Sequence, residues 1–506
     1  MAGIGKTTLA HHVYSSVKDN FDICAWVTVS QSSEADDLLR KIVEEFRKND
    51  RTNEFPKDVD VTECRSLVKT IRCYLEDKRY ILVFDDVWNV NVWFDCKDAF
   101  IHGNGRILFT SRIYEIVITP KHLFLSVGES VQRYEEAAHR QPRSLLVFHS
   151  SFSFISLRSL AMSNKLLSVL NLQDSSIKCL PAEVFGLRNL RFLGLRRTKI
   201  SSLRGSIGRL KNLLVLDAWK CGIMKLPLQV MKLSKMTHLI VTSKYAGSSL
   251  QFVPSVGIPA PVGICSLTSL QTLLQMEASA EMVHAMGALV EMRTFRISKV
   301  QGYHCEDLFK GIGRMIHLTH LGIQADDNQE ISRLIAFQAP PLLHKFFLLG
   351  AISKESLPNF FTALSELKNL KFLRLVGSRL NKDAFLYLKG LEHLVKLQLY
   401  DAYAGDKLYF PAASFPKLRV LKIRGGPYLN EIEIERGAMA SLVDLKLLLC
   451  PQLKMLPDGI EHVSTLEELT LDVAEELVDR VWQKKEKKIL HVQRVYVGPQ
   501  SLPVTC

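Results

Sequence analysis

A short stretch at the start of the chain has the chemistry of a phosphate-binding loop. Gly5, Lys6 and Thr7 supply the second half of the pattern G-x-x-x-x-G-K-[ST]. In that pattern backbone N–H groups surround the phosphates, the lysine reaches the β- and γ-phosphates, and the hydroxyl residue binds Mg²⁺. Gly3 and Thr8 would add N–H groups, and a helix that begins here would favour an anion at its N-terminus. The stretch predicts a nucleotide site.

Two carboxylates and an arginine further along could complete this site. "RYILVFDDVW" is typical of an apolar strand that ends in Asp85 and Asp86. A carboxylate at the C-terminal end of such a strand binds the metal directly or through water. "GRILFTSR" predicts a second strand, and Arg112 follows it, where a cation could sense a terminal phosphate.

The elements that must position these residues alternate between strand and helix. "FDICAWVTVSQS" predicts a strand and "EADDLLRKIVEEFRK" an amphipathic helix, so the block should form a parallel α/β sheet. The first glycine of the loop would lie one position before Met1, and the strand that normally delivers the loop is missing. We therefore expect a gap in the sheet beside the loop, which rearrangement or water would have to fill.

From about Pro142 onward a pattern of three apolar residues recurs. Two variable residues separate the first apolar residue from the second, and one variable residue separates the second from the third. Most steps are 22 to 27 residues, and one 34-residue step requires an insertion around residues 245–262. This period is typical of leucine-rich repeats, which must stack to bury their apolar side. The sequence predicts a curved, horseshoe-like solenoid. The fourteen copies start at Leu167, Leu190, Leu213, Met236, Leu270, Met292, Leu318, Leu343, Leu370, Leu394, Leu418, Leu442, Leu466 and Val492, with a plausible earlier copy at 142–148.

The concave sheet of such a solenoid is the usual binding surface. Its outward positions in the later copies include Arg374, Lys422, Arg424 and Lys446, which an acidic ligand could contact. The alternative is a solvated basic ridge. Trp219 is an aromatic residue of the kind that anchors interfaces, unless a neighbouring loop covers it.

The charge of the chain is unevenly distributed. The net charge is +13, yet residues 1–112 hold 16 basic and 18 acidic residues, so the whole basic excess lies downstream. It could mark an acidic partner, an acidic neighbouring domain or weak attraction to nucleic acid, or only a lysine-rich solvated surface. The run "QKKEKKIL" could be a nuclear address, a nucleic-acid patch or a solvated helix face.

Composition places the chain among ordinary globular proteins. It has 506 residues, of which 47% are hydrophobic and 23% charged, which is enough for two or three domains. The ten cysteines form no C-x-x-C pair, so we expect reduced thiols. We find no signal peptide and no apolar run long enough to span a bilayer, and we expect a cytoplasmic protein, with nuclear or peripheral plasma-membrane locations as alternatives.

The motifs in this order resemble a known family. "GIGKTTLA", "FDICAWVTVSQS", "KRYILVFDDVW" and "GNGRILFTSR", ahead of intracellular-type repeats, are similar to the NB-ARC block of plant NLR disease-resistance proteins, above all the coiled-coil class of cereals. The resemblance implies an intracellular immune receptor that ADP holds closed. Perception of a pathogen effector or a host guard protein through the repeats would permit exchange for ATP, assembly with other NLR chains, and cell death.

The resemblance also implies roles for individual residues. Lys6 would bind phosphate, Thr7 would hold Mg²⁺ and Asp85 would complete the metal site. Asp86 would orient the attacking water, and Arg112 would act as the sensor arginine.

The chain departs from the family in three ways. It lacks the coiled-coil signalling domain and the first glycine of the loop, and only about 29 residues separate Arg112 from Pro142, where the family has two ARC subdomains. We therefore expect a truncated member with a partial nucleotide-binding domain at 1–115, a linker at 116–141 and a leucine-rich-repeat domain at 142–500. Without these subdomains the nucleotide loses one wall of its cleft, and a loop anchored at only one end loses entropy when it binds, so binding of ADP or ATP with Mg²⁺ should be weak or lost. The switch should also fail, because a two-state switch requires a second body that rotates.

Two other readings stay open. One is a working NTPase, and the other is a leucine-rich-repeat interaction scaffold or degenerate gene product without switch activity. Nucleic acid is not an expected partner.

Overall fold

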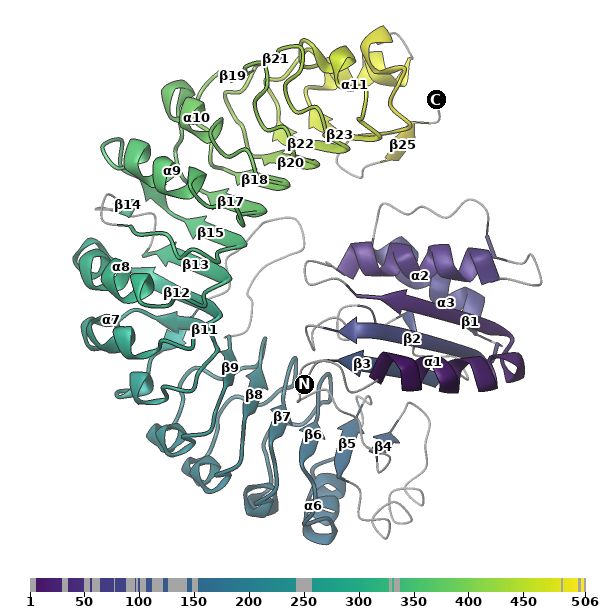
Figure 1. The fold of residues 1–506 in the computed structure, drawn as a ribbon, viewed down its shortest axis with the longest axis vertical. Coiled ribbons are helices and arrows are strands. Elements are labelled where there is room, and N and C mark those ends of the chain that lie inside the picture. The colour runs from purple at the N-terminus through teal and green to yellow at the C-terminus, as the bar shows by residue number, and fades with distance from the viewer. Residues whose placement is uncertain are drawn as a thin grey trace. The chain divides into compact units, whose positions relative to one another are not determined.

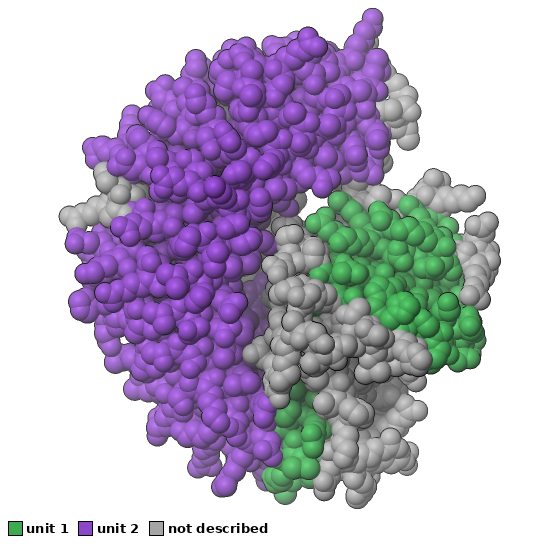
Figure 2. All heavy atoms as spheres, viewed as in Figure 1, with its two compact units in different colours: residues 1–152, 159–171 green, residues 153–158, 172–506 purple. Residues whose placement is uncertain are grey.

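The computed structural model describes most of the chain and divides it into two compact units. Unit 1 comprises residues 1–152 and 159–171, and unit 2 comprises residues 153–158 and 172–506 (Figure 2). Within helices and strands, some residues are described by their backbone alone. The described residues are 6–29, 35–49, 55–56, 64–76, 78–87, 96, 99–100, 106–111, 122–125, 143–147, 153–242, 257–326, 330–331, 337–483, 486–498 and 502–504.

Unit 1 contains a three-stranded parallel sheet in the order β1-β2-β3 (Figure 1). Its strands are β1 (Ile23–Thr28), β2 (Tyr80–Val87) and β3 (Arg106–Ser111). The strands lie where the sequence predicts them, although β2 continues past the two aspartates to Val87. The predicted parallel α/β architecture is confirmed.

Three helices accompany this sheet: α1 (Lys6–Val17), α2 (Ala35–Asn49) and α3 (Cys64–Leu75), and a 3-10 turn η1 (Lys18–Asn20) follows α1. Helix α1 packs against β2 and β3, whereas α2 packs against β1 and α3 packs against α2. The sequence predicts the first two helices but not α3.

The expected gap in the sheet is absent from the described strands. β2 and β3 pair directly, from Ile81 opposite Arg106 to Phe84 opposite Phe109, and the register shifts before Val87. The backbone groups of the two strands therefore satisfy one another, which is why no opening is needed.

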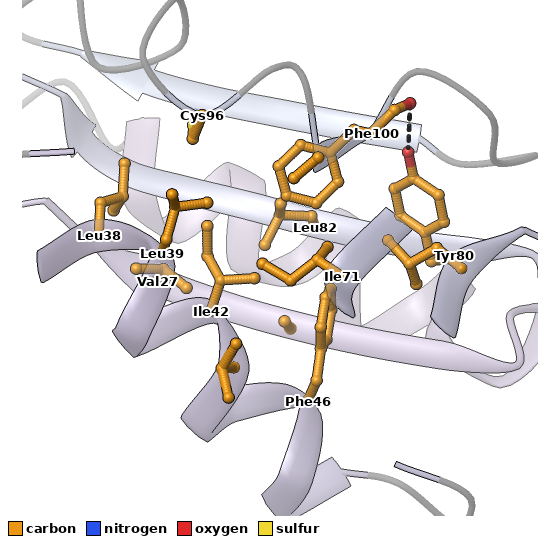
Figure 3. Close-up of a cluster of buried hydrophobic side chains, with 14 of the residues drawn as sticks. Val27, Leu38, Leu39, Ile42, Phe46, Ile71, Tyr80, Leu82, Cys96 and Phe100 are labelled. Carbon is orange, nitrogen blue, oxygen red and sulfur yellow. Dashed lines mark hydrogen bonds between the residues drawn. The ribbon is translucent and has the colours of Figure 1, made fainter. Parts of the chain in front are cut away.

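The core of unit 1 lies on the side of the sheet that α2 and α3 cover (Figure 3). Alternate residues of β2, Tyr80, Leu82 and Phe84, meet Ile42 and Phe46 of α2, all at most 2% exposed. Because apolar residues recur on α2 at helical spacing, one face of that helix is buried along its length.

Unit 1 also contains three short strands that run parallel in the order β4-β5-β6. β5 falls in the proposed early copy of the repeat, and β4 forms within the stretch expected to be a linker. The helix α6 (Phe154–Ser163) lies between the second and the third of them in sequence. The strands are β4 (His122–Leu125), β5 (Ser144–Val147) and β6 (Val169–Asn171).

Unit 2 is a curved stack of parallel strands, with helices and turns on its outer, convex side (Figure 1). The final strand, β25, runs antiparallel to β24. The strands are β7 (Phe192–Gly194), β8 (Val215–Ala218), β9 (His238–Val241), β11 (Thr272–Glu277), β12 (Thr294–Val300), β13 (His320–Ala325), β15 (Lys345–Leu349), β17 (Phe372–Val376), β18 (Lys396–Tyr400), β20 (Val420–Arg424), β22 (Asp444–Cys450), β23 (Glu468–Val473), β24 (Arg494–Val497) and β25 (Leu502–Val504).

The burial pattern explains the stack. The first apolar residue of every one of the fourteen predicted copies is at most 2% exposed. Strands β9 and β11 pair directly, with Leu239 opposite Leu273, so the 34-residue step is one repeat with an insertion. The end of that insertion returns as β10 (Ile258–Pro259), which pairs with β11, while residues 243–256 lie outside the described residues. The predicted solenoid is confirmed.

The convex side changes along the array. The early repeats carry 3-10 turns, the middle repeats carry α-helices, and the later ones add the small parallel sheet of β19 and β21. These elements are η4 (Ala182–Gly186), η5 (Gly205–Arg209), η6 (Leu228–Lys232), η7 (Ile264–Ser266), α7 (Ala280–Ala285), η8 (Met286–Ala288), η9 (Gly302–His304), α8 (Cys305–Gly313), β14 (Glu330–Ile331), β16 (Ala351–Ile352), α9 (Leu357–Ser365), α10 (Lys382–Leu388), β19 (Lys407–Phe410), β21 (Glu431–Ile434), η11 (Ile460–His462), α11 (Glu475–Trp482) and η12 (Lys487–Ile489).

Three further observations concern the described parts of the chain alone. The cysteines there are free thiols. No helix among these residues is both long and apolar enough to cross a bilayer. The same residues contain no group of three His, Cys, Asp or Glu side chains that could hold a metal ion.

Candidate functional site

The structure describes one side chain of the predicted nucleotide site, that of Asp85. This aspartate pairs with Thr28 in the register of β1 and β2, and its carbonyl accepts a hydrogen bond of 2.8 Å from the Val29 N–H. Its side chain is buried, at 7% exposure. Because Phe84 faces α2 and side chains alternate along a strand, Asp85 faces the opposite side, on which α1 packs. The carboxylate is therefore on the side of the sheet where the lysine-bearing helix lies.

The other predicted residues of that site are described only in part. Lys6, Thr7 and Thr8 form the first turn of α1, and Asp86 belongs to β2, each by backbone alone. Gly3, Gly5 and Arg112 lie outside the described residues. Their geometry around a phosphate stays a prediction.

The four basic residues predicted to bind a partner lie on three strands of unit 2. Arg374 is opposite Gln398, which is opposite Lys422, which in turn is opposite Lys446. Arg424 lies two residues beyond Lys422 on the same strand. Because residues two apart on a strand share a face, all four lie on one face of the sheet.

The charges on this face are not equivalent. The Lys446 ammonium is 2.9 Å from Glu468 Oε1 and 3.6 Å from Asp444 Oδ2, so acidic neighbours balance it. At Lys422, burial together with repulsion from Lys446, Arg424 and Arg374 lowers the pKa to about 8. The positive face therefore ends at β22.

Arg296 is a residue that the sequence analysis did not select. Its guanidinium carbon lies 4.5 Å from the centroid of the Phe347 ring, and that of Arg374 lies 5.1 Å from the same ring. Burial, with the nearby Arg374, lowers the pKa of Arg296 to about 10. Two arginines thus share one aromatic ring on the face that carries Lys422.

Gly322 makes this arrangement possible. It lies between Arg296 and Phe347 in the register of β12, β13 and β15. A Cβ atom on Gly322 would stand 2.8 Å from Arg296 Cγ, closer than real Cβ contacts come. The glycine therefore leaves room for the arginine to cross β13. The sequence contained one clue to this contact, because Arg296, Gly322 and Phe347 occupy the same position in successive repeats.

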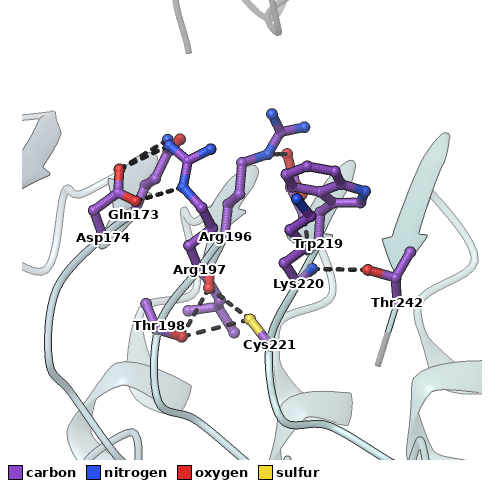
Figure 4. Close-up of polar contacts among 11 residues, drawn as sticks. Gln173, Asp174, Arg196, Arg197, Thr198, Trp219, Lys220, Cys221 and Thr242 are labelled. Atoms are coloured by element: carbon purple, nitrogen blue, oxygen red, sulfur yellow. Dashed lines mark hydrogen bonds and ion pairs between the residues drawn. The ribbon is translucent and has the colours of Figure 1, made fainter. Parts of the chain in front are cut away.

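Trp219 lies in a different cluster, near the start of unit 2 (Figure 4). Its ring is half-buried, with the Arg196 guanidinium 4.8 Å and the Lys220 ammonium 4.3 Å from the centroid. Its backbone N–H donates to Asp217 Oδ1 at 3.2 Å. Burial and repulsion by Arg197 and Arg196 lower the pKa of Lys220. Cationic side chains therefore lie against this tryptophan.

Comparisons with known proteins agree with both units. Residues 141–496 match the family described as a leucine-rich repeat region, and residues 1–128 match the NB-ARC domain. The fold and the motifs thus define a leucine-rich-repeat protein with a nucleotide-binding domain in front. The chain belongs to the NB-ARC leucine-rich-repeat (NLR) family of plant disease-resistance proteins.

Individual relatives carry matching names. Disease resistance protein RPM1 of Arabidopsis thaliana is 32% identical over 248 residues, which are 49% of this chain and 26% of the relative. Late blight resistance protein homolog R1B-19 of Solanum demissum is 36% identical over 134 residues, 24% of this chain and 10% of the relative. The chain thus spans about a quarter of the length of the first of these relatives.

Solved structures of leucine-rich-repeat proteins also align with the chain. A leucine-rich-repeat protein of Leptospira interrogans aligns with a TM-score of 0.43 at 18% identity, over 69% of this chain and 89% of that one. An internalin domain of Listeria monocytogenes aligns with a TM-score of 0.45 at 14% identity, over 70% of this chain and 68% of that one.

Proposed function

We propose that this protein is an intracellular, cytoplasmic plant immune receptor whose repeats recognise a pathogen effector or a host guard protein. The observation that carries the proposal is the joint match to the NB-ARC domain and the leucine-rich repeats in a single chain. Relatives named for disease resistance support it. We also propose, from the amino-acid sequences of its four motifs, that the protein belongs to the coiled-coil class of these receptors found in cereals.

The same proposal includes a nucleotide site in unit 1. Lys6 and the backbone of the first turn of α1 would bind the phosphates of ADP or ATP, and Arg112 would contact the terminal phosphate. Thr7 and Asp85 offer a hydroxyl and a carboxylate, which are the hard oxygen ligands that Mg²⁺ prefers. The buried position of Asp85 on the α1 side of the sheet supports this assignment. Asp86 would orient a water molecule.

We propose that nucleotide binding is weak and does not operate a conformational switch. The NB-ARC match ends at residue 128 and the repeat match begins at 141, which leaves no length for two further subdomains. Without a second domain that rotates, the protein has no two conformations that ADP and ATP could favour differently. Recognition through the repeats is then the principal activity.

Titration of the purified chain with fluorescent ADP tests the nucleotide site. We expect binding that is weak, that strengthens with Mg²⁺, and that Lys6→Ala abolishes. Lys18→Ala, in the 3-10 turn η1 that follows this helix, is the matched control and should bind as the parent protein does. Tight binding, or binding that Lys6→Ala leaves unchanged, would contradict the proposal.

An interaction scaffold without a receptor role is the second candidate. The continuous sheet of unit 2, with its basic and aromatic face, favours it as much as it favours a receptor. Deleting the gene and scoring resistance separates the two, because a scaffold outside immunity predicts no change.

A further inference from the structure

Cations and aromatic rings alternate across the concave sheet of unit 2. The Arg296 and Arg374 guanidinium carbons lie 4.5 and 5.1 Å from the Phe347 ring. Arg374 and the Lys422 ammonium lie 5.3 and 5.6 Å from the Tyr400 ring. We call these five residues, Arg296, Phe347, Arg374, Tyr400 and Lys422, the cation–aromatic ladder.

The ladder brings like charges together, at a cost in free energy. Burial and mutual repulsion lower the pKa of Arg296 and of Lys422. Nearby, burial and repulsion by Lys345, Arg296 and His344 lower the pKa of His320 to about 3. Among the residues that the structure describes, no carboxylate forms an ion pair with Arg296 or Lys422. An anion placed here would relieve the repulsion.

The ladder is also rigid enough to select a ligand. Arg374 Nε donates a hydrogen bond of 2.6 Å to Gln398 Oε1, which fixes the direction of its planar fork. A guanidinium whose face lies on a ring can still present its N–H edge to a carboxylate. The close approach of Arg296 to Gly322 places the second guanidinium against the same Phe347 ring.

The dimensions of the ladder favour an extended peptide. Neighbouring strands are about 4.8 Å apart, so Arg374 and Lys422, two strands apart, are separated by roughly 10 Å. Three residues of an extended chain span about 10 Å. Asp444 and Glu468 follow the ladder at β22 and β23, where they would repel the continuous phosphates of a nucleic acid.

We propose that the cation–aromatic ladder binds an extended acidic segment of a partner protein, whose aspartate or glutamate carboxylates pair with Arg296, Arg374 and Lys422. The rings of Phe347 and Tyr400 back these contacts. The inference rests on the proposed function, in that unit 2 is taken as the surface that recognises a protein.

Fluorescence anisotropy on the full chain tests the inference. The probe is a fluorescein-labelled peptide with glutamate at every third position and glycine and serine between. We expect salt-sensitive binding that Arg296→Gln and Arg374→Gln each weaken about fivefold or more. Lys389→Gln is the matched control, because that exposed lysine directly follows α10 and lies outside the ladder, and it should stay within about twofold.

Several outcomes would overturn the inference. They are unchanged binding in both arginine variants, an equal loss in Lys389→Gln, or tighter ladder-dependent binding of a single-stranded RNA of equal charge. If an arginine variant melts early by circular dichroism, Lys422→Gln supplies the same test. Failure here leaves the receptor proposal intact, because resistance in plants that express Arg374→Gln is scored separately from peptide binding.

Discussion

Arg196 and Asp217 form an ion pair of 3.4 Å, and their side chains are only 6% and 5% exposed. One step along the same array, Arg197 and Asp174 form a pair whose side chains are each 31% exposed. The two pairs join successive repeats and differ in their access to water. They also differ in geometry, since Arg197 contacts both carboxylate oxygens of Asp174, at 2.5 and 3.0 Å (Figure 4).

Asp217→Asn should therefore destabilise unit 2 far more than Asp174→Asn does. The first change leaves the Arg196 guanidinium buried without its counter-charge, which costs about 3 kcal/mol. The second breaks a half-exposed pair and should cost at most about 1 kcal/mol. Urea unfolding of both variants measures the difference. Equal decreases in the free energy of unfolding would show that burying the ion pair does not affect its contribution to stability.

Gly459→Ala should destabilise the later repeats much more than Gly437→Ala. Both glycines have positive φ, +82° and +89°, where an alanine costs about 1–2 kcal/mol. At Gly459 a Cβ atom would also meet the Ile434 carbonyl oxygen at 1.9 Å, whereas nothing lies within 4 Å at Gly437. The close approach should add at least about 1 kcal/mol. Thermal unfolding of the two variants compares them, and similar midpoints would contradict the close contact.

Lys422→Met should change how stability depends on alkaline pH. The folded pKa of this lysine is about 8 and its ordinary value is 10.5, so between these values the unfolded state binds more protons. Stability of the parent protein should therefore rise with pH across this window relative to Lys422→Met. Urea unfolding at pH 7.5 and pH 10 measures the slope. A parallel pH dependence in both proteins would mean that Lys422 is well hydrated.

His320→Gln should protect the fold in acid. Burial, with nearby cations, lowers the folded pKa of His320 to about 3 from 6.5, so the unfolded chain takes up this proton first. The parent protein should thus lose stability relative to His320→Gln as the pH falls from 6.5 toward 3. His317→Gln, at an exposed position just before the same strand, is the control and should follow the parent. Identical acid profiles for all three proteins would refute the prediction.

Much of unit 1 could be predicted from short patterns. The strands β1, β2 and β3 and the helix α2 lie where apolar runs and helical spacing place them. The helix α3 was missed, and the expected gap in the sheet was wrong because β2 and β3 pair with each other. Pairing between strands depends on the whole sheet, and no local pattern records which edges will meet.

The candidate sites divide in the same way. Alternation along the later strands predicted that Arg374, Lys422 and Lys446 share a face. It could not predict that Glu468 and Asp444 balance Lys446. Charge balance depends on side-chain distances of a few ångströms, and the repeat pattern fixes only the order and face of the residues.

The sequence by itself determined the repeat, because each copy must bury the same apolar positions and a single copy cannot do so alone. It also determined the order of the nucleotide-binding motifs, since each motif is local. Only the tertiary structure decided that Arg296 reaches Phe347. The two residues are far apart in the chain, and their contact requires the register of three strands and the missing side chain of Gly322 between them.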